Sequence, residues 1–169
     1  TIDLNPNTKL RLAFERERRS AWVSGGEAYF QIAHDPGRPF VIHAGGHDVT
    51  VLGTKFSVRR ERDLLRVAVL QGAVQLKGVG RNSTLGSTVL PRGSMAVATS
   101  MATIVTREPL DRLDQGLRWR EGAMVLDGPP LGQAVAELNR YTQIPIVVAD
   151  DQLAAMAIGG VFQLDNRDR

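Results

Sequence analysis

The sequence predicts a mainly β protein with a small α+β lobe at its C-terminal end. Apolar and polar residues alternate with a period of two in many short runs between residues 8 and 105, which is typical of half-buried strands. Glycine and proline, which favour turns, occur 17 and 8 times in 169 residues. After residue 107 the apolar spacing changes to that of an amphipathic helix.

The alternation locates the strands of the β lobe. The expected strands lie at 10–14, 28–32, 40–42, 49–51, 56–58, 67–76 with a break at Gly72, 95–97 and 104–105. Asp35-Pro36-Gly37 and Gly45-Gly46 predict turns, and the Gly-, Ser- and Thr-rich residues 78–88 predict a loop. Gly26, Gly72 and Gly122 precede strands in similar contexts and suit bulges or bends. The lobe is therefore expected to be either solenoid-like or sandwich-like.

The second half predicts a connecting helix and then a βαβ-type lobe. Leucines at 110, 113 and 117 have helical spacing, and 124–126 reads as a strand. Leu131, Ala134, Val135, Leu138 and Tyr141 form one stripe of a helix that cannot continue past Pro145. Strands are expected at 146–148 and 158–164. The division expected is a β lobe over 1–106, a connection over 107–123, and a lobe over 124–169 that is incomplete, because 165–169 resembles the cap of a further helix.

The composition argues against several classes of protein. The formal net charge is only +3, and acidic residues interrupt each arginine cluster, so no nucleic-acid partner is expected. Without cysteine there is no disulfide scaffold and no thiolate metal site. No apolar run approaches the ~20 residues of a membrane helix, and no signal peptide is visible. Since the chain begins with Thr1, we expect a segment of a longer protein whose membrane anchor is absent here.

Few residues suggest reaction chemistry. His43 and His47, with Asp48 as a third ligand, could approach a metal ion across a turn. We expect instead that these histidines are exposed in the turn and bind no metal. Asp150-Asp151 fits a strand-end turn or a helix N-cap better than an acid–base pair. No motif of a serine hydrolase, nucleotide-binding loop or zinc protease occurs. We therefore expect no enzyme activity, no cofactor and no metal.

Eight short motifs follow one another along the chain. They are GEAYF at 26–30, DPGRPFV at 35–41, GTKFSV at 53–58, VLQGAV at 69–74, WREG at 119–122, PL at 130–131, ELNRY at 137–141 and IGGVF at 158–162. In this order they resemble the extracytoplasmic part of FecR-type regulators, membrane anti-sigma factors that report on iron–siderophore import. The tail resembles a secretin and TonB N-terminus short domain, of which the second half is largely absent.

This resemblance implies a periplasmic sensor of cell-surface signalling. A cytoplasmic sigma-binding domain and one membrane helix would precede Thr1. The implied partner is the periplasmic signalling domain of a TonB-dependent outer-membrane transporter, and the output is regulated proteolysis that releases an extracytoplasmic-function sigma factor. The siderophore, the transporter and the sigma factor are not identified by the sequence.

Unpaired strand edges and apolar side chains in the tail would give such a partner a place to add a strand. The residues expected to bind it are Leu131, Leu138, Tyr141, Ile146, Val148, Phe162 and Leu164. Two alternatives remain open at this point. A glycan-binding β module would need more exposed aromatic residues than two tryptophans and two tyrosines supply. A β-solenoid hydrolase or lyase would need a positioned acid and base.

Overall fold

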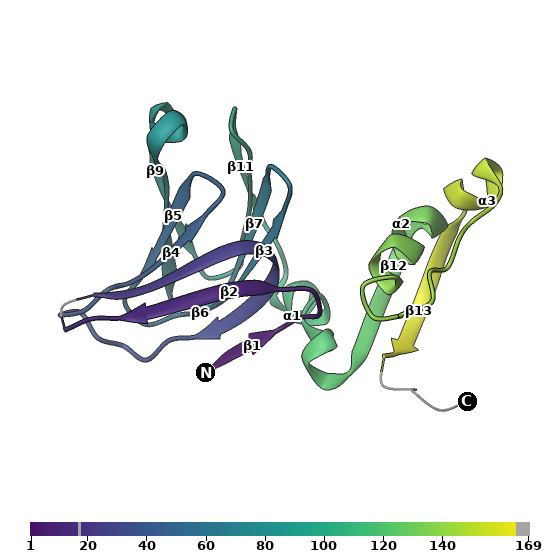
Figure 1. The fold of residues 1–169 in the computed structure, drawn as a ribbon, viewed down its shortest axis with the longest axis horizontal. Helices are drawn as coiled ribbons and strands as arrows, with labels where there is room; N and C mark the ends of the chain where they lie inside the picture. The colour runs from purple at the N-terminus through teal and green to yellow at the C-terminus, as the bar shows by residue number, and fades with distance from the viewer. Residues whose placement is uncertain (17, 165–169) are drawn as a thin grey trace. The chain divides into compact units, whose positions relative to one another are not determined.

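The computed structural model describes residues 1–16 and 18–164, which form two compact units (Figure 1). Unit 1 is Thr1–Leu113, and unit 2 is Asp114–Arg169, described as far as Leu164. The predicted division at 106 and 123 stays a prediction, and the run 165–169 lies outside the described residues. Strands make up 52% of the structure and helices 17%, which confirms the mainly β class with a small helix-containing lobe.

Unit 1 is a single sheet of eleven strands. Its strands are β1 (Ile2–Leu4), β2 (Lys9–Phe14), β3 (Arg19–Gln31), β4 (Phe40–Ala44), β5 (His47–Val51), β6 (Lys55–Glu61), β7 (Leu64–Gln71), β8 (Ala73–Gly78), β9 (Ser87–Pro91), β10 (Ser94–Ala98) and β11 (Thr103–Arg107). The expected strands are all present. The alternation did not predict β1, β9 or residues 19–27 of β3, and the expected loop at 78–88 contains a short 3-10 helix, Gly80–Leu85, and the start of β9.

The long strand β3 takes part in two different sets of ladders. Its residues 19–25 pair with β2, and 19–22 also pair with β4 in parallel. Its residues 26–31 pair with β6, and 28–30 pair with β1. The order β11-β10-β7-β6-β3-β4-β5-β8-β9 thus folds into two leaflets that share β3 (Figure 1). The last strand, β9, contacts β7 and β10 of the other leaflet, so the sheet nearly closes on itself.

The two leaflets enclose one apolar core. Inward-facing residues alternate with outward-facing ones along each strand, as the period of a strand requires. Phe30 and Phe56 stack with ring centroids 5.2 Å apart at the centre. Side chains of β3 to β10 form a single buried cluster, so the structure corresponds to the sandwich-like alternative.

The three glycines in similar contexts share an unusual backbone conformation. Gly26, Gly72 and Gly122 have φ values of 90°, 81° and 73°, which favour glycine. Gly26 lies where β3 passes from one leaflet to the other, and a Cβ atom there would lie 2.5 Å from the Cα atom of Thr8. A bend is confirmed at Gly72 and a turn at Gly122, whereas Gly26 lies within the continuous strand β3.

Unit 2 begins within helix α1 (Leu110–Gln115), which straddles the boundary. A 3-10 helix, Arg118–Glu121, leads into β12 (Ala123–Pro130), followed by α2 (Leu131–Leu138), α3 (Asp151–Ala155) and β13 (Ala157–Gln163). Strands β12 and β13 are antiparallel neighbours. The strand predicted at 146–148 is wrong, since these residues form no ladder with any described residue.

Within the described residues, no helix combines the length and the apolar character needed to cross a membrane.

Replacing Gly26 with alanine should lower the free energy of unfolding by about 2–4 kcal/mol, because a left-handed conformation is costly for other residues and the new methyl group displaces the backbone of Thr8. Gly25→Ala is the matched control, since its Cβ would meet nothing within 4 Å. Urea unfolding followed by circular dichroism measures both. Equal stabilities of the two variants would contradict this description of β3.

Candidate partner-binding site

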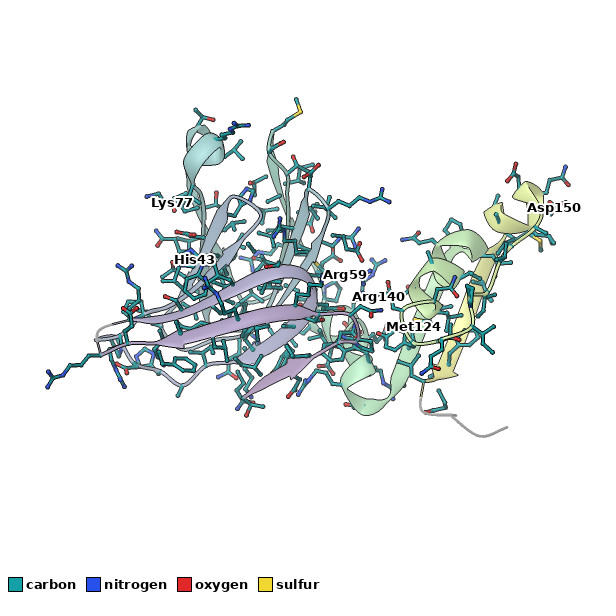
Figure 2. The ribbon with its side chains drawn as sticks, in the orientation of Figure 1. His43, Arg59, Lys77, Met124, Arg140 and Asp150 are labelled. Carbon is teal, nitrogen blue, oxygen red and sulfur yellow. The ribbon has the colours of Figure 1, made fainter. Side chains whose placement is uncertain are left out.

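Unit 2 has a small apolar core between its sheet and α2. Met124 and Leu126 of β12 and Ala134 of α2 are buried there (Met124 is labelled in Figure 2). Partly buried side chains complete the cluster: Leu138, Tyr141, Ile158, Phe162 and Leu164. Four of the residues predicted to bind a partner, Leu138, Tyr141, Phe162 and Leu164, therefore pack against the lobe's own core, and each keeps part of its surface exposed.

Leu131 is the first residue of α2 and is half-buried. Its backbone N–H donates to the carbonyl oxygen of Met156, at 2.7 Å, which ties the start of α2 to the segment that enters β13. Pro130 precedes it at the N-cap position, where a missing N–H costs the helix nothing. Leu131 thus positions the helix and offers only part of its side chain to a partner.

Ile146 and Val148 lie in residues 145–149, which follow a bend at Ile144, have no regular secondary structure and belong to no sheet of the described structure. The side chain of Asn139 replaces a neighbouring strand: its Nδ2 donates to Ile146 O at 2.9 Å, and its Oδ1 accepts from Ile146 N at 2.8 Å. The Ile146 side chain is 47% exposed and Val148 is half-buried. The seven predicted residues therefore do not form one exposed surface: some pack against the lobe's own core, and others are exposed to solvent.

Only one side of residues 144–149 forms hydrogen bonds with the rest of the described lobe. Ile144 N–H donates to Thr142 Oγ1, and that hydroxyl donates to Ile144 O, so Ile144 and Ile146 both direct their backbone groups toward side chains of the lobe. Alternate residues of an extended chain direct these groups to opposite sides. The backbone N–H and C=O of Val147 bond to no described residue, so they are available on the other side.

The sequence reasoning missed the most exposed apolar residues of the lobe. Ile144 and Val147 are each 80% exposed. Leu153, Met156 and Val161 are exposed as well, at 50%, 59% and 56%. A signal was present, because residues 144–148 are uniformly apolar apart from Pro145 and lack the alternation of a strand with one buried face.

The histidines near the β4–β5 turn have separate partners. His43 Nδ1 lies 2.7 Å from Asp48 Oδ1. His47 is only 2% exposed, and its Nδ1 donates to the carbonyl oxygen of Gly45 at 3.2 Å, so the expectation of a turn-exposed His47 is wrong. It is buried because strand alternation places it on the core side, like Val49. Among the described residues, no group of three or more His, Asp or Glu side chains could hold a metal ion.

Asp150 caps helix α3 (Figure 2). Its Oδ1 accepts hydrogen bonds from the backbone N–H groups of Gln152 and Leu153, at 2.7 and 3.0 Å. The predicted N-cap is therefore confirmed. Its carboxylate stabilises unpaired N–H groups of the helix end, which is a structural role.

Asp35, in the turn between β3 and β4, pairs with Arg38 at 2.9 Å. Burial raises the pKa of the Asp35 carboxyl, but the hydrogen bond and charge of Arg38, together with the charge of Arg19, outweigh it and leave this pKa below its usual value. Such exposed pairs contribute little to stability. The Asp35–Arg38 pair holds the turn between β3 and β4 and does not point to a catalytic role.

Comparison with known proteins identifies the family that the first 75 residues match. Residues 1–75 match the family model described as FecR protein. These residues belong to the FecR family. The resemblance to FecR-type anti-sigma factors is therefore confirmed, and the match covers the strands from β1 to the first residues of β8. No curated protein matches the chain significantly.

Solved structures share the fold of this chain. It resembles two crystal structures, at 1.65 and 2.50 Å resolution, each of a proposed anti-sigma factor from Parabacteroides distasonis ATCC 8503. The TM-scores are 0.72 and 0.71, and sequence identity is 23% in both cases. The matches cover 98% of this chain and 77% and 76% of the others, so they support the fold at a low level of identity.

Replacing Asn139 with alanine should release residues 145–149. The Ile146 amide loses its only acceptor among the described residues, so its hydrogen exchange should accelerate about tenfold or more. Exchange measured by NMR tests this. Gln143→Ala is the control, because Gln143 is exposed and its side chain bonds to no described residue. Unchanged exchange at Ile146 in the Asn139 variant would contradict the observed clamp.

Proposed function

We propose that this chain is the periplasmic sensor region of a membrane-anchored anti-sigma factor, and that unit 2 binds the signalling domain of a TonB-dependent siderophore transporter. The FecR family of residues 1–75 supports the regulatory class. The observation that carries the partner site is the stretch 144–149, in which the Val147 backbone bonds to no described residue and the side chains of Ile144 and Val147 are each 80% exposed.

Backbone pairing is the binding mode that this segment supports. An incoming strand would bond to the N–H and C=O groups of Val147, which have no partner in the described chain. Asn139 already holds the other side at Ile146, so the segment is held in place before the partner arrives. Pre-organisation of this kind reduces the entropy cost of association.

The exposed apolar side chains would supply selectivity. Ile144 and Val147 would contact the alternate side chains of an added strand. Leu131, Leu138, Tyr141, Phe162 and Leu164 would act mainly by holding the lobe in shape, with their exposed portions at the edge of the contact. Ile146 and Val148 belong to the binding segment itself.

The signal would then pass by binding, without turnover of a substrate. In this proposal the sigma factor is held by a cytoplasmic domain and the anchor is a single helix, both in a longer protein to which this chain belongs. Occupation of unit 2 would favour proteolysis of that protein and release of the sigma factor.

Replacing Val147 with proline should weaken binding to the transporter's signalling domain about tenfold, because it removes a free N–H donor and blocks close approach of a strand. Folding should be unaffected, since that N–H bonds to no described residue. Val147→Thr, which keeps the N–H and the shape, is the matched control. Biolayer interferometry with the transporter's signalling domain measures both.

Two further variants separate this site from other apolar surface. Val147→Asp should abolish binding, whereas Val89→Asp, at a 63% exposed position of β9, should bind normally. A chain cut before Pro129 should fail to bind. Undiminished binding by the cut chain would eliminate unit 2 as the receptor surface.

A further inference from the structure

One end of unit 1, where the β4–β5, β6–β7 and β10–β11 turns lie, contains an open cavity of about 500 Å³. Its polar and aromatic lining includes Trp22, His43, Asp48, Arg60, Arg62 and Asp63. All six residues belong to unit 1, so the cavity is independent of the segment proposed above for the transporter. Its volume lies within the range of sites that hold small molecules or short peptide segments.

One wall of the cavity is a row of side chains across neighbouring strands (His43 is labelled in Figure 2). Trp22 is in register with His43, and His43 with Asp48. The rings of Trp22 and His43 are 5.1 Å apart, and Arg11 lies over the Trp22 ring at 4.0 Å. The Asp48 carboxylate fixes the imidazole through Nδ1. The wall is therefore ordered before any ligand binds.

Two arginines reach the same cavity with unused donors. Arg60 donates from Nη1 to Val23 O at 3.2 Å, and its buried Nε has no acceptor among the described residues. Arg62 forms no ion pair or hydrogen bond with any described residue. A guanidinium carries five N–H donors in a planar fork that matches a carboxylate. The cavity thus has a donor capacity that unit 1 leaves largely unused.

The backbone of Arg62 indicates that its side chain has a role. Glu61 pairs with Leu64, so Arg62 and Asp63 form a two-residue turn between β6 and β7. Arg62 has φ of 51°, in the left-handed region, which costs a residue other than glycine about 1–2 kcal/mol. Strained residues of this kind cluster at functional sites. Glycine would suit the turn better, yet an arginine occupies it and lines the cavity.

We propose that this cavity binds a carboxylate side chain of an acidic peptide segment. Arg60 and Arg62 bind the carboxylate by charge-assisted hydrogen bonds, and Trp22 with His43 packs against the methylene groups. A free inorganic anion would fill little of the volume and would not use the aromatic wall. Asp48 is already engaged by His43, whereas Asp63 forms no ion pair with a described residue and opposes the incoming charge.

NMR of the natural chain tests the proposal, because its two tryptophans give two indole signals, which Trp119→Phe assigns. The probes are acetyl-triglutamate amide, acetyl-triglutamine amide, inorganic phosphate and chitotriose. Triglutamate should shift the Trp22 indole signal in a saturable way, and added salt should weaken this binding. The other three probes should not saturate it. Saturation by triglutamine, phosphate or chitotriose at equal or lower concentration would overturn the assignment to an acidic peptide.

Three variants test the roles of the charges. Arg60→Gln and Arg62→Gly should each weaken triglutamate binding about tenfold. Arg62→Gly should also leave the melting temperature unchanged or higher, because glycine tolerates the turn, so its loss of binding cannot reflect misfolding. Asp63→Asn should strengthen binding about two- to fivefold. Arg81→Gln, an exposed position outside the lining, is the charge-matched control. Equal affinities of Arg62→Gly and Arg81→Gln would overturn the proposal.

Discussion

The continuity of β3 through both leaflets is the constraint on which unit 1 depends. The junction is secured by a small polar group around Glu27, which is only 6% exposed. Its backbone N–H donates to Thr8 Oγ1 at 3.0 Å, and its carboxylate accepts from Asn5 Nδ2 at 2.8 Å and lies 3.7 Å from Arg59. A buried carboxylate is tolerated only with such partners. They align the first strands and β6 on the same part of β3, next to Gly26.

The alternation of apolar residues was sufficient to predict most of this sandwich, because each strand has one buried face. It failed where that condition does not hold. Strand β9 buries little besides Leu90, and its Ser- and Thr-rich neighbourhood is typical of loops. Which leaflet a strand joins could not be predicted either. The parallel pairing of β3 with β4 depends on contacts between residues distant in sequence.

The candidate site in unit 2 illustrates a different limit. The helical stripe through Leu138 and Tyr141 was recognised correctly, but a stripe does not reveal whether a partner or the lobe itself covers it. Residues 146–148 have strand-like composition without a strand's partner. Asn139 takes the place of that partner, and an asparagine at the end of a helix gives no such signal in the sequence. The proposed binding segment could therefore be recognised only from the hydrogen bonds in the structure, and not from the sequence.

The two units differ in how much apolar surface they bury, and this difference bears on signalling. The core cluster of unit 1 contains 19 fully buried residues, whereas that of unit 2 contains Met124, Leu126 and Ala134. A lobe with so small a core opens more readily than the sandwich. A partner that adds a strand at Val147 would stabilise the closed lobe by mass action without altering unit 1. Backbone pairing gives affinity with little selectivity, while charged side chains govern specificity and the rate of encounter. The apolar segment of unit 2 and the arginine-lined cavity of unit 1 are chemically suited to these separate tasks.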